Sequence, residues 1–230
     1  MQITKSVAAA AAAFMMFIPL QQASAAKIRD LRFTDGRQFI QPQKQALDQL
    51  GSQATRTELH TRMLRLDRGI AISKKSSEVW HGTRTYRYEQ TFHGIPIYQY
   101  PITIIERESG EVLDVSGTVV DDLGQDIPTL IPKITPEAAL KLAQEEWSMQ
   151  LQPLATFANE HVEEVVYLDQ QHAGHLAYRV LFQVWERNSQ TPSVPNILVD
   201  AYTGRILEKV DTLVHANARN RRNRNRDGVR

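Results

Sequence analysis

A regular alternation of apolar and polar residues from Arg84 onward restricts the fold more than any other feature of the chain. The stretch "RTYRYEQTF" repeats its aromatic side chains with a period of two, which predicts a β-strand. After the turn "HG", the stretch "IPIYQYPITIIE" resumes a strand, in which Pro96 and Pro101 indicate an edge position or a β-bulge. Gly110 then supplies a hairpin turn before "EVLDVSGTVVDD". Three antiparallel strands in this order form a meander.

The second half of the chain follows a linker that bears Pro and Gly, "DDLGQDIPTLIPKI". Thr135 is placed as the N-cap and Pro136 as the first residue of a helix, "PEAALKLAQEEW". The stretches "EEVVYLDQ", "HLAYRVLFQVWE" and "NILVDAYTGRILEKVD" follow as strands, the last with a turn at Thr203 and Gly204. A helix followed by antiparallel strands predicts an α+β fold.

We therefore predict two small α+β domains, each an antiparallel sheet with helix packing, over residues 26–127 and 128–212. Residues 27–80 show only weak apolar spacing, so we expect them to be mostly helical or irregular. The polar stretch "SSEVWHGT" is expected to interrupt them.

The first 25 residues have the order of features of a secretory signal peptide. Lys5 precedes an apolar run from Val7 to Leu20, and small residues stand at Ala23 and Ala25. This run is shorter than the roughly 20 residues needed to span a bilayer, so we expect cleavage after Ala25. We then expect an exported chain, periplasmic or extracellular, without a further membrane span. The alternative is an uncleaved membrane anchor.

The chain contains no cysteine, so an exported form must rely on its core instead of disulfides. Residues 213–230 are predicted to be a disordered tail, because their arginine-rich stretch "RNRRNRNRDGVR" cannot form a core. Such a tail suits an acidic protein surface or phosphate-rich lipid. The alternation of Arg with Asn, without aromatic residues, argues against nucleic-acid binding as the main role.

The stretch "YRYEQTFHGIPIYQYPITIIERESGEVLDVSGTVVDDL" resembles the FTP domain in the prosegments of thermolysin-like and fungalysin metalloproteases. That family has an aromatic strand that ends in Gln-Thr, then a Gly-Val/Ile-Pro step and a hairpin that closes on a glycine. The matching residues here are Gln90, Thr91, Gly94, Pro96, Gly110 and Gly117. We interpret the Gly-Ile-Pro step as a bend in a scaffold, without a chemical role.

The stretches "ITPEAALKLAQEEW", "LAYRVLFQV" and "NILVDAYTGRIL" resemble the PepSY domain that follows FTP in the same prosegments. The shared marks are a Thr-Pro-Glu-Ala helix start, a Tyr-Arg-Val strand and a Val-Asp-Ala-x-Thr-Gly-x-Ile strand at residues 199–206. The two resemblances together cover about residues 50–212.

The resemblance implies a protein that binds a thermolysin-like zinc metalloprotease, inhibits it and helps it to fold. It implies no enzyme, because the His-Glu-x-x-His motif of the protease is not found in this sequence. No cofactor is expected. Two alternatives stay open, namely a truncated remnant of a metalloprotease precursor and a non-catalytic extracytoplasmic binding scaffold.

The stretch "LVHA" resembles a prosegment junction, with cleavage expected between His215 and Ala216. Leu213 and Val214 are expected to fill apolar subsites of the protease cleft, and a new carboxylate at His215 to reach its zinc. The alternative is that residues 213–216 only end a strand and begin the tail.

The stretch "HAGH" places His172 and His175 three residues apart in a predicted hairpin turn. A zinc site needs three or four converging ligands, and the sequence offers no obvious Cys, Glu or Asp partner. We expect two solvated turn histidines and no metal site.

Overall fold

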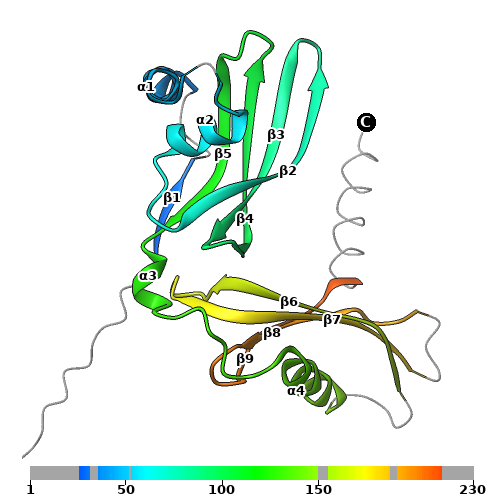
Figure 1. Ribbon diagram of the computed structural model, residues 1–230. Helices are drawn as coiled ribbons and strands as arrows, with labels where there is room; N and C mark the ends of the chain where they lie inside the picture. The colour runs from blue at the N-terminus through cyan, green and yellow to red at the C-terminus, as the bar shows by residue number, and fades with distance from the viewer. Residues whose placement is uncertain (1–25, 32–35, 52, 150–154, 187–190, 214–230) are drawn as a thin grey trace, which may run out of the picture.

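The computed structural model describes residues 26–31, 36–51, 53–149, 155–186 and 191–213. It has two lobes, each with a β-sheet and at least one helix, and the chain passes from one to the other through α3 (Leu123–Asp126) (Figure 1). This architecture confirms the α+β class. The domain boundary between residues 127 and 128 stays a prediction.

The upper lobe of Figure 1 confirms the antiparallel meander and extends it by a fourth strand. The pairing runs β2–β3–β4–β5, and β1 pairs with the other side of β5. The elements before α3 are β1 (Lys27–Asp30), η1 (Gly36–Phe39), α1 (Ile40–Leu50), α2 (Arg56–Leu64), β2 (Ile70–Trp80), β3 (Thr83–Phe92), β4 (Ile95–Arg107) and β5 (Val112–Asp121).

Strand β2 corrects the expectation that residues 27–80 are mostly helical or irregular. It pairs only with β3, so it is an edge strand, and it includes most of the stretch expected to be an interruption. Only Ile70 and Ile72 of this strand are buried. The period-two apolar signal is missing because most of the strand's side chains face solvent.

Strand β4 lies inside the sheet, so of the two alternatives that its prolines indicate, an edge position or a β-bulge, the edge position does not apply. It pairs with β3 on one side and with β5 on the other. The predicted bulge is confirmed, because the register with β3 jumps from Pro101 opposite Glu89 to Pro96 opposite Thr91. Residues 97–100 of β4 therefore lie opposite Gln90 alone, and the strand bends there.

The side chain of Gln90 replaces the backbone hydrogen bonds that this bulge removes. Its amide nitrogen donates to the carbonyl oxygens of Tyr100 and Thr118, each at 2.7 Å, and its amide oxygen accepts from the Val120 N–H at 3.1 Å. Gln90 is fully buried, so each of these bonds satisfies a group that has no access to water. The Gln of the FTP motif is thus a structural residue.

Gly117 permits β5 to approach β4 beside the bulge. A Cβ atom at this position would lie 2.3 Å from the carbonyl oxygen of Pro101 and 3.1 Å from the Cα of Ile102. The φ angle of Gly117 is +118°, which L-residues rarely adopt. Two independent restraints therefore require glycine here.

The lower lobe contains one helix on one face of a four-stranded antiparallel sheet. The N-cap is confirmed, because the Thr135 side chain accepts from the Ala138 N–H at 3.2 Å and Pro136 is the first helical residue. The elements are α4 (Pro136–Ser148), β6 (Thr156–Leu168), β7 (Gly174–Trp185), β8 (Pro195–Asp200) and β9 (Ile206–Asp211).

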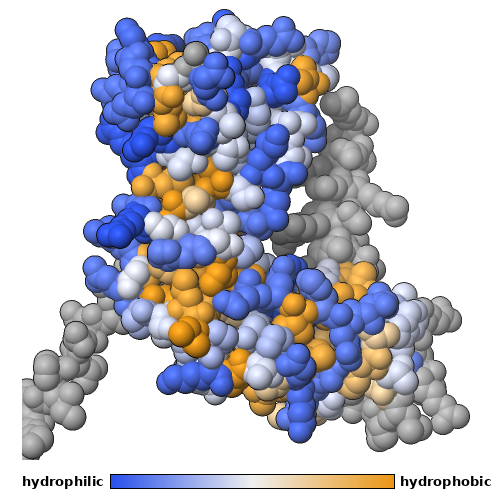
Figure 2. All heavy atoms as spheres, in the orientation of Figure 1, coloured by the Kyte–Doolittle hydropathy of each residue, from blue (hydrophilic) through white to orange (hydrophobic). Residues whose placement is uncertain are grey.

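The two lobes are joined by a strand pairing between their sheets and by a common hydrophobic core. Ile97 of β4 pairs in parallel with Val166 of β6, which joins the two sheets. Phe92 and Val120 of the upper lobe belong to the same buried cluster as Val180 of the lower lobe. Hydrophilic side chains cover most of the upper lobe in the space-filling view, and apolar side chains gather toward the junction and over the lower lobe (Figure 2).

A second core lies within the upper lobe and encloses polar side chains. His60 of α2 is fully buried, with Nδ1 at 2.6 Å from the Tyr88 hydroxyl and Nε2 at 2.7 Å from the Glu106 carboxylate. Burial raises the pKa of Tyr88 to about 12.

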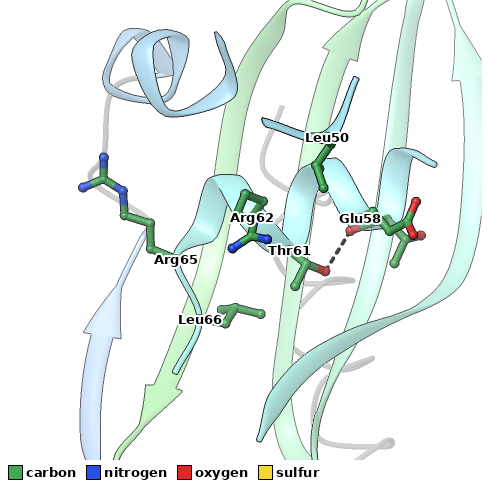
Figure 3. A pocket seen from close by; sticks show the side chains of 7 residues that line it. Leu50, Glu58, Thr61, Arg62, Arg65 and Leu66 are labelled. Atoms are coloured by element: carbon green, nitrogen blue, oxygen red, sulfur yellow. Dashed lines mark hydrogen bonds between the residues drawn. The ribbon is translucent and has the colours of Figure 1, made fainter. Parts of the chain in front are cut away.

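A hollow of about 490 Å³ lies beside α2 on the surface (Figure 3). It is lined by Leu50, Thr57, Glu58, Thr61, Arg62, Arg65 and Leu66.

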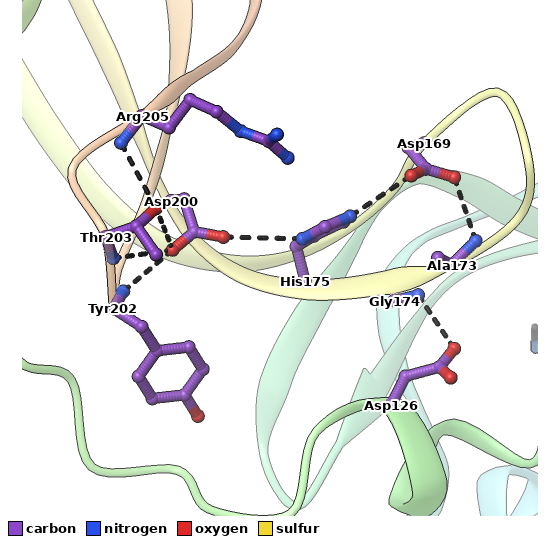
Figure 4. Close-up of polar contacts among 9 residues, drawn as sticks. All are labelled: Asp126, Asp169, Ala173, Gly174, His175, Asp200, Tyr202, Thr203 and Arg205. Carbon is purple, nitrogen blue, oxygen red and sulfur yellow. Dashed lines mark hydrogen bonds and ion pairs between the residues drawn. The ribbon is translucent and has the colours of Figure 1, made fainter. Parts of the chain in front are cut away.

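The two histidines of "HAGH" differ, which corrects the expectation of two solvated turn residues; Figure 4 shows His175 between Asp169 and Asp200. His172 is exposed in the turn before β7. His175 lies in β7, and its side chain is only 19% exposed. Its Nδ1 is 3.3 Å from a carboxylate oxygen of Asp200, and its Nε2 is 3.2 Å from one of Asp169. His175 therefore connects two turns of the lower lobe.

Asp200 organises the turn between β8 and β9. Its Oδ1 accepts from the Tyr202 N–H at 3.0 Å, and from the Thr203 N–H and hydroxyl at 2.8 Å each. Burial opposes ionisation of Asp200, but these bonds and His175 outweigh it and lower the pKa of the carboxyl below 3.8. The predicted turn is confirmed, with Gly204 at a φ of +73°. The Asp, Thr and Gly of the PepSY motif thus form one turn.

Replacing Gly117 by alanine is expected to destabilise the protein by more than about 2 kcal/mol, because the new Cβ would overlap the Pro101 carbonyl. Urea unfolding measures this change. The matched control is Gly124→Ala in α3, where a Cβ meets no atom within 4 Å and φ is not positive. Equal stabilities of the two variants would contradict the structural role of Gly117.

Replacing Asp200 by asparagine is expected to cost about 1–3 kcal/mol at pH 7, because the charged acceptor is lost. The folded pKa of Asp200 is lowered, so its contribution is complete above the unfolded pKa of about 4 and disappears as pH falls through the folded value. Urea unfolding from pH 7 to pH 3 should show the gap between wild type and Asp200→Asn narrowing below pH 4. A gap that stays constant over this range would disprove the assignment.

Candidate functional site

The predicted cleft segment begins directly after the edge strand of the lower lobe. Among the described strands, β9 pairs with β8 alone. After β9, the Thr212 N–H and hydroxyl donate to the Val194 carbonyl at 3.0 and 2.8 Å, and the Leu213 N–H donates to Asp211 at 3.0 Å. The start of the segment is therefore held against the lobe up to Leu213, which is half-buried. Val214, His215 and Ala216 lie outside the described residues.

One face of the β6–β9 sheet is turned away from α4, and we call it the open face. In β7, Leu176 and Tyr178 belong to the core on the α4 side, so Ala177 between them points to the open face. Ala177 packs there with Val165 and Leu198. The partly buried side chains around these three residues are Tyr98, Tyr167 and Leu207.

Arg179 occupies the centre of a polar network on the open face. Its Nε donates to the side-chain oxygen of Asn196 at 3.2 Å, and its Nη1 to Glu163 at 2.6 Å. The guanidinium carbon lies 5.0 Å from the ring centre of Tyr98, which is a cation–π distance. Asn196 in turn donates to the Tyr98 hydroxyl at 2.7 Å. Because Tyr98 belongs to β4, this network connects the two lobes.

Sequence reasoning did not identify this network. The resemblance to PepSY included the Tyr-Arg-Val strand but gave Arg179 no role, and Tyr98 was only part of an expected strand. Tyr98 and Arg179 are far apart in the chain, and no local pattern relates them. A planar guanidinium in the middle of an otherwise apolar strand is the one available signal.

The described residues contain no group of three or more His, Cys, Asp and Glu side chains that could hold a metal ion.

A second hollow, of about 380 Å³, lies beside the β6–β7 turn and β9, with Tyr167, Arg205 and Glu208 in its lining. Within the described part of the chain, no helix is long and apolar enough to cross a membrane. Among these features, the edge strand β9 is of a kind to which an extended peptide can add by backbone hydrogen bonds.

Comparison with known families gives two matches, in the order expected. Residues 72–119 match the family described as "Fungalysin/Thermolysin Propeptide Motif" (FTP). Residues 133–210 match the family described as "Peptidase propeptide and YPEB domain" (PepSY). The first match covers β2 to β5 and the second covers α4 and β6 to β9, so the matches account for most of both sheets.

Similar curated proteins are proteases from Vibrio species. The chain is 33% identical over 140 residues to the "Neutral protease" of Vibrio proteolyticus, a match that covers 60% of this chain and 22% of that protein. It is 32% identical over 139 residues to the "Hemagglutinin/proteinase" of Vibrio cholerae serotype O1, again with 60% and 22% covered. The matched region is thus about a fifth of the length of these relatives.

A solved structure also matches in part, the "Bacillus megaterium YpeB C-terminal domain". The match covers 74% of this chain and 64% of that chain, with 17% identity and a TM-score of 0.29. The two family matches and the Vibrio relatives carry the assignment without it. Residues 72–119 and 133–210 therefore carry an FTP region and a PepSY region, in the order that the resemblance to thermolysin-like metalloprotease prosegments implies.

Proposed function

We propose that this chain is an exported, non-enzymatic protein that binds a thermolysin-like zinc metalloprotease, inhibits it and assists its folding. The observation that carries the proposal is the FTP–PepSY pair, matched to Vibrio proteases over only 22% of their length. A partner that binds the nearly native protease lowers the free energy of that form and so favours its folding. The same contact blocks the active site once folding is complete.

The inhibitory segment in this proposal is Leu213, Val214 and His215. Leu213 follows an edge strand and its N–H donates to Asp211, which supports the proposal because the segment then starts from a defined point on the lobe. Leu213 and Val214 fill apolar subsites of the protease. Cleavage between His215 and Ala216 gives His215 a carboxylate, which binds the catalytic zinc as a product does.

Three versions of the chain that differ only at the C-terminus test this segment. They begin at Ala26 and end at Arg230, His215 or Leu213. The last keeps Asp211 and Thr212, which contact Val194, so the lobe should stay folded. Progress curves of a purified thermolysin-like neutral protease should show slow, tight inhibition by the first two versions. The version that ends at Leu213 should bind more weakly by roughly tenfold or more.

Each other outcome has a distinct meaning. Equal inhibition by all three versions would remove the inhibitory contact from residues 214–215 and locate it on the folded lobes. Digestion of all three without inhibition would overturn the proposed function and favour a precursor remnant or a binding scaffold.

Folding assistance is expected to be separable from inhibition. A denatured mature protease of the thermolysin type should regain more activity when it is diluted into buffer with residues 26–230 than without them. Activity is assayed after the added chain has been removed by proteolysis. The version that ends at Leu213 should retain this effect if the lobes bind the late folding form. Identical recovery with and without the chain would disprove the folding role.

A further inference from the structure

The backbone nitrogen of Ala26, the first residue that the structure describes, lies close to a buried carboxylate. Ala26 follows the predicted signal segment, yet it is only 5% exposed. Its nitrogen lies 3.0 Å from the carbonyl oxygen of His172 and 3.1 Å from Oδ2 of Asp126. One N–H is thus shared between two acceptors, one of which is a carboxylate.

The carboxylate of Asp126 has more hydrogen-bonding capacity than its neighbours use. Oδ2 also accepts from the Gly174 N–H at 2.8 Å (Figure 4). Oδ1 is buried and has no hydrogen-bond partner among the described residues. Among the ion pairs of the described residues, none involves Asp126, whereas its neighbour Asp122 pairs with Lys27 at 2.6 Å. A buried carboxylate oxygen without a partner is costly, so a donor that reached this oxygen would stabilise the fold.

We propose that signal-peptide cleavage supplies this donor, and that Asp126 is the binding site for the new N-terminus. Hydrolysis breaks the bond between the Ala25 carbonyl carbon and the Ala26 nitrogen. Water gives its hydroxyl to the Ala25 carbonyl and a hydrogen to the nitrogen, and the amine then takes a proton from solvent. An α-amino group has an ordinary pKa of about 8, so it is a cation at neutral pH.

The donor count of this ammonium fits the site. It has three N–H groups. Two acceptor oxygens lie within hydrogen-bond distance of the nitrogen, and a third belongs to the same carboxylate as one of them. These are the His172 carbonyl, Asp126 Oδ2 and Asp126 Oδ1. The ammonium and the carboxylate form a charge-assisted pair in place of a shared neutral amide.

The position of the pair gives it a consequence for the whole fold. Ala26 precedes β1 of the upper lobe, Gly174 begins β7 of the lower lobe, and Asp126 ends the helix between them. Gly174 lies close to this helix, since a Cβ there would lie 2.7 Å from Cδ2 of Leu123 and 3.3 Å from the Cβ of Asp126. Cleavage therefore completes the junction of the two lobes only in the exported chain. The inference rests on the predicted cleavage site and not on protease binding.

The first test compares chain starts. Export of the full precursor followed by mass spectrometry should give Ala26 as the first residue. Two further chains are then compared in urea, one that starts at Ala26 and one with a single extra glycine before it. The free Ala26 start should raise the folding equilibrium constant roughly 10- to 100-fold over the extended start.

Substitution of Asp126 identifies the partner. In an Asp126→Asn background, the difference between the two starts should disappear. The matched control is Asp122→Asn, which removes a neighbouring carboxylate that already pairs with Lys27 and should leave the difference intact. Equal stability of the two starts in wild type, or a difference that survives Asp126→Asn, would overturn the proposal, as would a different first residue after export.

A second readout covers the case that Asp126→Asn does not fold. The α-amine of the wild-type chain is acetylated with acetic anhydride, and its rate is compared with that of the chain extended by glycine. A buried, ion-paired ammonium should react several-fold more slowly than the extended start, and the difference should vanish in urea. Equal rates in the folded state would contradict the proposal. No protease enters these measurements, so they are independent of the proposed inhibition.

Discussion

The bend in β4 is the feature on which the arrangement of the whole molecule depends. β4 pairs with β5 from Ile102 onward and with β6 at Ile97, so one strand belongs to both sheets. The bulge lies between these two positions, and a bulge turns the direction of a strand. Its cost is the loss of backbone hydrogen bonds, which Gln90 replaces with three bonds from one buried side chain. Because the two lobes diverge at this bend, their relative orientation depends on the bulge in β4.

The junction is strengthened on both sides of β4. On the open face, Tyr98 follows Ile97 directly and contacts Arg179 and Asn196 of the lower lobe. On the side of α3, Asp126 accepts from backbone N–H groups of β7 and of the segment before β1. These contacts restrict the movement of one lobe relative to the other. Rigidity matters for a binding protein, because less conformational entropy is lost when the partner binds.

Predictions from the sequence were correct where a feature depends on neighbouring residues. They were less accurate where a feature depends on residues far apart in the chain or on exposed strand residues. The meander, the N-cap at Thr135 and the turn at Gly204 depend on neighbouring residues, and all three were predicted. β2 was missed, because an edge strand with exposed side chains has no periodic apolar pattern. The prediction that His175 is a solvated turn residue was wrong for a different reason. Its partner Asp200 is 25 residues away and meets it only when β7 and β8 pair. Tyr98 and Arg179 were unrelated in the sequence for the same reason.

The residues that carry the family resemblance are required by the backbone and not by a reaction. Gln90 and Gly117 permit the bulge, Thr135 begins a helix, and Asp200 forms a turn. Such residues specify the fold wherever it occurs, so they cannot distinguish one partner from another. Partner choice must instead depend on side chains that the fold leaves free to vary. In the proposed function this role falls to the segment that begins at Leu213, because Leu213 lies beyond the last strand of the described sheet and takes part in no strand pairing there.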